Sequence, residues 1–384
     1  MPSRRTFLSA AALGAATLAA TPLIANAQTA PGDVLPTRGR QAAQPQPLPT
    51  NPAGGRKYRP TPRVGLGGAP LGNNWAVVTE DDAQATLEAA WDGGMRLFDT
   101  SPWYGLGRSE RRFGHVLGQK PREDYVISSK VGRLLTATKE TPRVSWKDPP
   151  PFAYRYDYSA AGTRRSVEDS LQRLGIDSLD IVLVHDLSPD NGDMGDRWLE
   201  YFEQARTGAF PELTKMREEG LIKAWGMGVN TPDPAMRAIE VADPDIFLLA
   251  CQYSLLDHER ALDHTFPNLA TRGISVIVGS PLLAGFLAGR DRYLYGSQPV
   301  PPDAQRKRAK AEEIVRAHGV DLRTVALQFA NAPEVVSAIV PGARNAEQVA
   351  ANIASMSVAI PAAVWSDLRA AEIITANAPV PDAA

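Results

Sequence analysis

Four residues that can hold or transfer a proton lie close to the ends of three successive apolar segments. Asp99 and Tyr104 fall within the segment FDTSPWYG, Lys130 closes the segment VISSK, and His185 closes the segment IVLVH. If these segments are neighbouring parallel strands, their carboxyl ends meet at one face of a barrel. We therefore expect the four side chains to form one proton-transfer site.

The four residue types suit the reduction of a carbonyl or the oxidation of an alcohol. A tyrosine phenol has a free pKa of about 10, and an ammonium group beside it is expected to lower that pKa. Asp99 would hold Lys130 charged and oriented, because an unpaired ammonium is costly to bury. A neutral His185 would hydrogen-bond a carbonyl oxygen and orient it for hydride transfer.

The elements that must position these residues follow a regular alternation from Val64 onward. Short apolar segments alternate with amphipathic helices, which is typical of a parallel α/β fold. Eight such units over about 300 residues predict a (β/α)8 TIM barrel. We expect strands at residues 63–66, 96–98, 125–129, 181–185, 224–228, 247–252, 275–278 and 336–339. We expect helices at residues 80–91, 110–117, 163–174, 211–219, 233–241, 261–272, 303–317 and 322–330.

Four segments are longer than the minimal repeat needs, namely residues 133–157, 187–208, 290–302 and 361–384. Three of them follow expected strands, which predicts long loops at the C-terminal face, where barrel active sites are built.

A doubly wound dinucleotide-binding sheet is the alternative fold, suggested by Gly65, Gly67 and Gly68. It is disfavoured because Pro70 stands where that fingerprint needs its third glycine.

The N-terminal part predicts export. Arg4 and Arg5 precede an uncharged, Ala- and Leu-rich run that ends in Ala25-Asn26-Ala27, a small-x-small cleavage pattern. We expect residues 1–27 to be a twin-arginine signal peptide, recognised by the twin-arginine export machinery, with a periplasmic or otherwise exported product. Residues 28–59 are expected to be a flexible linker, residues 60–375 the barrel, and residues 376–384 a disordered tail. No stable membrane insertion is expected after cleavage.

Composition narrows the possible partners. The chain has 41 basic and 43 acidic side chains, a net charge of -2 and no basic stripe, so no nucleic-acid partner is expected. Cys251 is the single cysteine, which excludes an internal disulfide, and we expect no bound metal. Glycoside hydrolysis by a carboxylate pair such as Asp157 and Asp186 stays open as a minor alternative, because nothing in the sequence fixes their separation.

Across residues 63–357 the sequence resembles the aldo-keto reductase family. The motifs that carry the resemblance are FDTSPWYG at 98–105, Ser129-Lys130, Val184-His185-Asp186, Gly228-Val229-Asn230, Gln252-Tyr253-Ser254 and the segment VPGAR at 340–344. Within the family, the segments RYDYS at 155–159 and GTRRS at 162–166 resemble the branch of D-threo-aldose and L-fucose 1-dehydrogenases.

The resemblance implies hydride transfer between a bound NADP or NAD, with NADP favoured, and an aldehyde, ketone or sugar lactol. Tyr104 would be the acid or base, tuned by Lys130 and Asp99, and His185 would orient the substrate. Asn230 and Gln252 would contact the nicotinamide carboxamide, and Trp103 the substrate. The remaining cofactor residues implied are Gly68, Ser280, Leu282, Gly342, Arg344, Gln348 and Asn352.

Two questions remain open at this stage. The aromatic insert at residues 146–154 could wall the substrate site or pack on the barrel rim. A second function, a nucleotide-holding binding protein or redox sensor with vestigial turnover, gains weight from the expected export, because no NADPH pool is expected outside the cytoplasm to regenerate the cofactor.

Overall fold

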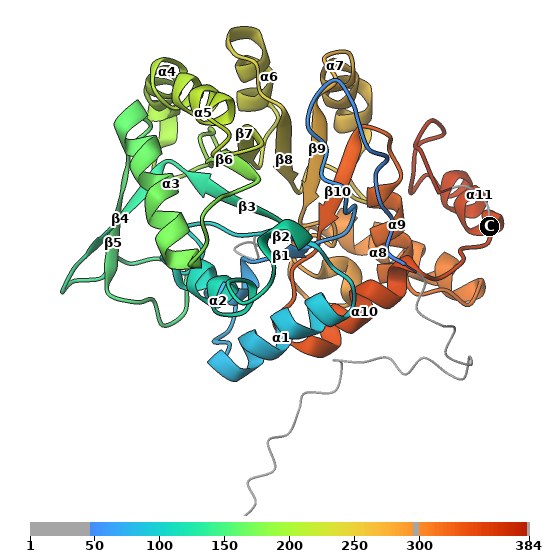
Figure 1. Cartoon of the computed structure of the whole chain (residues 1–384). Coiled ribbons are helices and arrows are strands. Elements are labelled where there is room, and N and C mark those ends of the chain that lie inside the picture. Colours follow the sequence, from blue (N-terminus) through green and yellow to red (C-terminus); the bar gives the residue numbers. More distant parts are fainter. Residues whose placement is uncertain (1–46, 295–298, 382–384) are drawn as a thin grey trace, which may run out of the picture. The chain divides into compact units, whose positions relative to one another are not determined.

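The computed structural model describes residues 47–294 and 299–381, and it confirms the parallel barrel (Figure 1). Eight parallel strands are hydrogen-bonded in the order β1-β2-β3-β6-β7-β8-β9-β10. Two parallel bridges, Val64 with Ile339 and Gly67 with Gly342, bring the first strand back to the last. The strands are β1 (Leu66–Gly67), β2 (Leu97–Asp99), β3 (Val126–Val131), β6 (Ile181–His185), β7 (Ala224–Val229), β8 (Ile246–Ala250), β9 (Ser275–Gly279) and β10 (Val336–Val340).

Helices surround this barrel (Figure 1). The helices that sequence periodicity predicts are α1 (Glu80–Asp92), α2 (Arg108–Leu117), α3 (Ala160–Leu174), α5 (Ala209–Glu218), α6 (Asp233–Val241), α8 (Pro302–Ala317) and α9 (Leu322–Asn331). The single helix expected at residues 261–272 is instead a π-helical turn at Ala261–Thr265 followed by α7 (Phe266–Ala270). Pro267 supplies no backbone N–H, which is consistent with the irregular geometry there.

Strand parity turns the site residues inward. Along β6, Ile181 and Leu183 belong to an apolar cluster inside the barrel, whereas Val182 and Val184 belong to the cluster between strands and helices. Because side chains alternate along a strand, His185 shares the inner face with Leu183. The same parity places Asp99 with Leu97 on β2, and Lys130 with Val126 on β3. Three of the four predicted residues therefore face the barrel interior.

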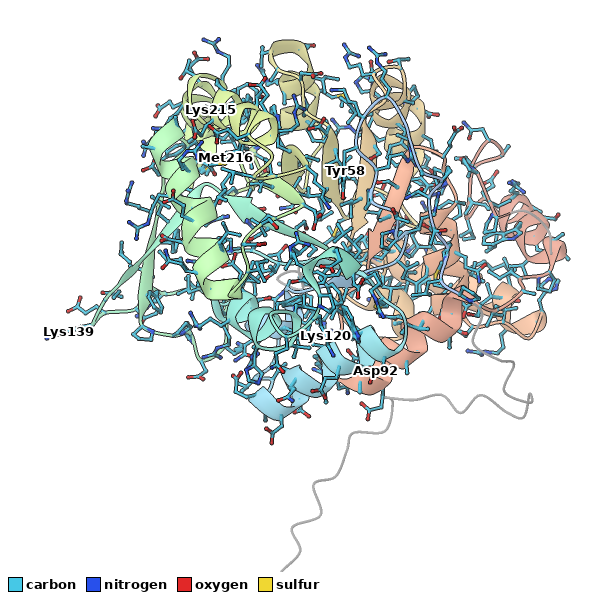
Figure 2. All side chains as sticks on the ribbon, in the orientation of Figure 1. Tyr58, Asp92, Lys120, Lys139, Lys215 and Met216 are labelled. Carbon is cyan, nitrogen blue, oxygen red and sulfur yellow. The ribbon has the colours of Figure 1, made fainter. Side chains whose placement is uncertain are left out.

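A β-hairpin occupies the segment 133–157, which we expected to be a loop. Strands β4 (Arg133–Ala137) and β5 (Phe152–Tyr156) pair antiparallel and stand apart from the barrel sheet. Lys139 lies at the outer end of this hairpin (Figure 2). The chain bends at Gly132, which has a φ of +112° and lies where a Cβ would be 2.2 Å from the ring of Tyr158.

Three further helices lie in segments where none was predicted. They are α4 (Trp198–Thr207), α10 (Ala346–Met356) and α11 (Ala362–Ala370). Asn345 caps α10 by accepting a hydrogen bond from the Gln348 amide. No helix among residues 47–294 and 299–381 has the length and apolar character needed to cross a membrane.

Both expected terminal boundaries need correction. Residues 47–59 are not a free linker, because Thr50 bridges to Pro62 and the buried Asn51 donates to the carbonyl oxygens of Pro60 and Ser337. Residues 376–381 are not a free tail, since Ala378 is buried and its carbonyl accepts from Arg369. Apolar burial and backbone hydrogen bonds hold both segments on the barrel. Residues 1–46, including the expected signal peptide, lie outside the described part.

Candidate active site

A buried ion pair joins the ends of β2 and β3. Lys130 Nζ lies 2.8 Å from both carboxylate oxygens of Asp99 and 2.8 Å from the carbonyl oxygen of Thr100. The three N–H groups of an ammonium are used by these three acceptors. Gly228 leaves room for the lysine chain, because an added Cβ would lie 3.3 Å from Lys130 Cε. The structure thus places Asp99 and Lys130 together, as the sequence predicts.

Tyr104 lies directly beside this pair. Lys130 Nζ is 4.6 Å from the centre of the tyrosine ring, over its face, and the His185 ring is 5.7 Å away, edge to face. Gly72 packs against the backbone of Tyr104, where an added Cβ would lie 2.6 Å from the Tyr104 carbonyl carbon. The three side chains therefore meet at the carboxyl ends of their strands.

The expected lowering of the tyrosine pKa is wrong for this structure. Burial raises the pKa of Tyr104 well above its ordinary value, and the charges of Asp99 and Asp186 raise it further. Asp99 neutralises Lys130, and Lys130 faces the ring. The phenol is therefore held protonated, which suits a proton donor to a carbonyl oxygen.

His185 is buried at the end of β6 and neutral. Burial, followed by the charges of Lys130 and Arg133, lowers its pKa well below the ordinary value. Its Nδ1 lies 3.0 Å from Ser101 Oγ and 3.4 Å from Arg133 Nη1. Because arginine is only a donor, Nδ1 is the acceptor and the ring proton sits on Nε2. The neutral ring thus presents an N–H donor.

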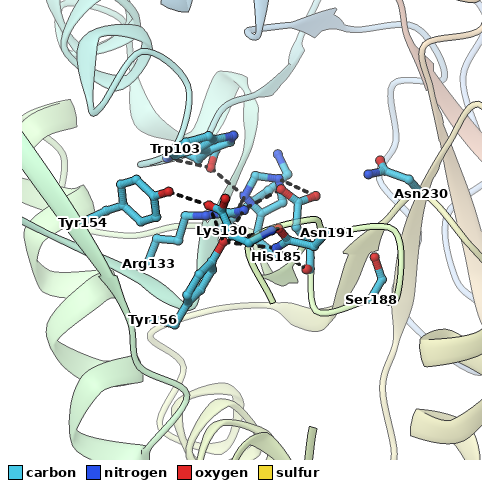
Figure 3. A network of polar contacts seen from close by, with 12 residues as sticks. Trp103, Lys130, Arg133, Tyr154, Tyr156, His185, Ser188, Asn191 and Asn230 are labelled. Atoms are coloured by element: carbon cyan, nitrogen blue, oxygen red, sulfur yellow. Dashed lines mark hydrogen bonds and ion pairs between the residues drawn. The ribbon is translucent and has the colours of Figure 1, made fainter. Parts of the chain in front are cut away.

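Arg133 and Asp186 form a second ion pair beside the first. Arg133 Nη1 donates to Asp186 Oδ2 at 3.0 Å, and Nη2 donates to the Tyr156 hydroxyl at 3.3 Å. The guanidinium also lies over the rings of Trp103 and Tyr156, at 4.5 and 5.0 Å. Figure 3 shows Arg133 between the hairpin tyrosines and His185.

An aromatic wall surrounds Tyr104. Trp103, the predicted substrate residue, lies 4.8 Å from Tyr154 and 5.7 Å from Trp146, measured between ring centres. Trp146 is 6.0 Å from Tyr104. Of the two arrangements left open for the insert, the structure therefore favours a wall over the site.

Asn230 and Gln252, the predicted carboxamide contacts, lie together just after the ends of β7 and β8. Gln252 Nε2 donates to the Asn230 carbonyl at 2.5 Å, and Asn230 Nδ2 donates to Asp190 at 3.0 Å. Figure 3 shows the Asn230 side chain facing the His185 cluster. Ser280 begins the loop after β9 in a left-handed conformation, and its hydroxyl accepts from the Ala284 amide.

Three other predicted cofactor residues have clear packing roles. Gly68 is buried, and an added Cβ would lie 2.7 Å from both the Asp99 carbonyl oxygen and Ser109 Oγ. Leu282 belongs to the apolar core. Gly342 is exposed and lets β10 approach the loop after β1, since a Cβ would lie 2.7 Å from Pro70. These roles explain the residue types without a ligand.

Two arginines near the start of α10 fit an anionic group. Burial, and then the charge of Arg344, lower the pKa of Arg292. Within residues 47–294 and 299–381 neither side chain is paired with a carboxylate, and Arg292 donates to the Ala284 carbonyl at 3.3 Å and stacks on Trp75 at 4.5 Å. Gln348 Oε1 accepts from the Arg344 amide, whereas Asn352 is buried in α10. Adjacent cations without a carboxylate suit the phosphates of a nucleotide.

Sequence comparison decides the family. The chain matches the Aldo/keto reductase family over residues 63–373. The protein belongs to this family. It is similar to a D-threo-aldose 1-dehydrogenase of a Pseudomonas species, 34% identical over 337 residues that cover 85% of this chain and 98% of the relative. It is also similar to pyridoxal 4-dehydrogenase of Microbacterium luteolum, 37% identical over 328 residues that cover 81% of this chain and 94% of the relative.

A structural comparison agrees on the fold. An aldo/keto reductase from Klebsiella pneumoniae in complex with NADP and acetate superposes with a TM-score of 0.59 at 21% identity. The match covers 84% of this chain and 95% of that one. The family match and the two dehydrogenase relatives show that the present aldo/keto reductase is an oxidoreductase that acts on carbonyl or CH–OH groups, in a family that uses NAD(P).

Sequence reasoning missed three residues of this aldo/keto reductase site. Arg133 belongs to none of the motifs found in the sequence. It reaches the site only because the chain bends at Gly132. Asn191 and Tyr156 come from a long segment and the hairpin, and Asn191 Nδ2 donates to both Tyr156 and the Asp186 carbonyl. A recognised hairpin would have placed Arg133 and Tyr156, whereas Asn191 comes from the long segment after β6.

Asp157 and Asp186, the two carboxylates considered for glycoside hydrolysis, each bind another partner in this aldo/keto reductase. Asp157 accepts from the amide and hydroxyl of Ser159 at the start of α3 and pairs with Arg155. Asp186 pairs with Arg133. Each carboxylate has its own partner, which gives no support to a hydrolytic pair.

Proposed function

We propose that the protein transfers a hydride between NADP(H) and an aldehyde, ketone or sugar lactol, with Tyr104 as the acid or base. The observation that carries this proposal is the close packing of Tyr104 against the buried Asp99–Lys130 pair and the His185 ring. A proton donor and a neutral N–H group then converge on one carbonyl oxygen, while the cofactor supplies or accepts the hydride.

Each side chain has a distinct task in this proposal. The protonated Tyr104 donates its hydroxyl proton to the oxygen that becomes an alcohol. His185 Nε2–H orients the same oxygen, and Lys130 fixes the tyrosine ring from its face. In oxidation the alcohol proton moves to Tyr104, and this requires a lower pKa than the raised one found here. The positive charge of an oxidised nicotinamide would lower that pKa in the loaded enzyme.

NADP is the favoured cofactor. Its binding would use Asn230 and Gln252 for the carboxamide, and Arg344 with Arg292 for phosphate groups. The loop after β9 supports close approach of a ligand to backbone, because Ser280, Leu283 and Ala284 all have left-handed φ values between 49° and 61°. Gln348 holds the Arg344 backbone, and Gly68, Leu282, Gly342 and Asn352 would act on the cofactor only indirectly, by packing behind this surface.

An aldose is the favoured substrate, which the resemblance to D-threo-aldose 1-dehydrogenase supports. The aromatic wall of Trp103, Trp146 and Tyr154 offers ring faces and edges to the apolar side of a sugar. The test is to screen the purified protein against L-fucose and D-arabinose with NADP and NAD, and against simple aldehydes with NADPH. We expect multiple turnovers with at least one pair and higher kcat/KM with NADP than with NAD. A single stoichiometric oxidation of a trapped nucleotide would instead favour a sensor.

Export through the twin-arginine pathway is part of the proposal. It is supported by Arg4-Arg5, the apolar run and Ala25-Asn26-Ala27. The pathway carries folded proteins, so nucleotide could be trapped before transport. Replacing Arg4 and Arg5 by Lys should retain an uncleaved precursor in the cytoplasm, whereas the unchanged chain should appear outside it, starting at Gln28. Fractionation and N-terminal sequencing measure both. Equal export of the two chains would contradict the assignment.

A further inference from the structure

Asp186 offers a hydrogen-bond acceptor beside the donor that meets the substrate oxygen. Its Oδ1 lies 3.5 Å from His185 Nε2, too far for a strong hydrogen bond. Its Oδ2 is held by Arg133 at 3.0 Å. Within residues 47–294 and 299–381, Oδ1 accepts no hydrogen bond. A donor on His185 and an open acceptor on Asp186 thus stand side by side.

The two members of the ion pair differ in exposure. The Arg133 side chain is 4% exposed and that of Asp186 is 17% exposed. The guanidinium therefore lies deeper in the protein, and the carboxylate lies nearer to the open side of the site. Asp186 also has a φ of +44°, which is costly for a residue with a side chain. Its carbonyl is held by Asn191 Nδ2 at 2.9 Å, and its amide donates to the Gly228 carbonyl at 2.9 Å. The backbone is therefore fixed in the conformation that aims this carboxylate.

This geometry fits a substrate with two oxygens on neighbouring carbons. The reacting oxygen accepts from His185 Nε2–H, and a hydroxyl on the next carbon donates to Asp186 Oδ1. A carboxylate only accepts hydrogen bonds, so a plain aldehyde or ketone leaves Oδ1 without a partner. Burial raises the pKa of Asp186, while the charge of Arg133 and its hydrogen bond oppose that rise and fix the carboxylate.

We propose that Asp186, held by Arg133, is the specificity-determining residue that selects substrates with a hydroxyl group on the carbon next to the reacting carbon. This inference rests on the proposed oxidoreductase function and narrows its substrates to α-hydroxy carbonyls and the corresponding lactols.

Matched substrates test the proposal. D-arabinose and 2-deoxy-D-ribose differ only in the hydroxyl next to the lactol carbon, and lactaldehyde and propanal form the same pair for reduction with NADPH. We expect the unchanged protein to prefer the hydroxylated member of each active pair by roughly 10- to 100-fold in kcat/KM, the range for a hydrogen bond to a charged group. In Asp186→Ala this preference should fall toward one, with most of the loss in the hydroxylated substrate.

A second variant guards against misfolding. Asp186→Asn keeps the side-chain shape and tolerates a left-handed backbone, and it should retain only part of the preference, because a neutral hydrogen bond is about half as strong. Asp169→Asn is the matched control, since it removes a carboxylate from a surface pair with Arg165 on α3. The control should keep the full preference.

The outcomes separate this inference from the proposed function. Equal losses on both members of a pair would make Asp186 a structural support and overturn the proposal, as would a missing preference in the unchanged protein. Turnover of propanal with no gain for lactaldehyde overturns the substrate inference and leaves a carbonyl reductase. No turnover with any pair removes the proposed function itself.

Discussion

Tyr104→Phe is expected to bind nucleotide as the unchanged protein does and to lose nearly all turnover. A positioned general acid or base contributes typically about 10²- to 10⁴-fold to rate, and kcat should fall within that range. The substitution removes one hydroxyl and keeps the ring against Lys130, His185 and Trp146. Packing should therefore survive. Steady-state kinetics and nucleotide titration measure the two effects.

The pH dependence is the control for this assignment. The pKa of His185 is lowered and that of Tyr104 is raised, so in the unchanged protein both are neutral across the physiological range. Reduction of a carbonyl should therefore show a flat rate through neutral pH and fall only under alkaline conditions, as Tyr104 loses its proton. Residual activity in Tyr104→Phe should lose that alkaline fall. Undiminished kcat in the variant would refute the role of Tyr104.

The barrel and the ion pair at its mouth could be predicted because both depend on local patterns. Asp99, Lys130 and His185 stand at the ends of apolar segments in the sequence, and the alternation of side chains along a strand turns them inward in the structure. The carboxyl ends of successive parallel strands must then meet. Predicting that Asp99, Lys130 and His185 meet therefore requires only the barrel fold and no knowledge of other contacts between distant segments.

The parts that failed depend on packing between distant segments. The chain bends at Gly132, so Arg133 leaves the strand pattern, and the hairpin that follows brings Tyr156 beside Arg133. The prediction of a lowered pKa for Tyr104 failed for a related reason, because the burial of the ring also depends on packing between distant segments. Burial is the main cause of the raised pKa of Tyr104, and the charges of Asp99 and Asp186 raise that pKa further. The three N–H groups of Lys130 are all given to Asp99 and Thr100.

Lys130→Met should both abolish turnover and destabilise the fold. The methionine chain can fill the space above Gly228, but Asp99 would remain as a buried carboxylate with only Ser128 Oγ and no cation. Removing one partner of a buried pair costs about 3–5 kcal/mol of unfolding free energy. Urea unfolding of the folded barrel measures that loss, and steady-state kinetics measure the activity.

The double substitution Lys130→Met with Asp99→Asn separates stability from catalysis. Neutralising the orphaned carboxylate should restore most of the lost unfolding free energy, because the cost arises from the unpaired charge rather than from the missing lysine chain. Turnover should stay low, since nothing then fixes the face of the Tyr104 ring. Recovery of stability together with activity would mean that the pair only supports the barrel. A single variant Lys130→Met that unfolds like the unchanged protein would contradict the burial of an uncompensated Asp99.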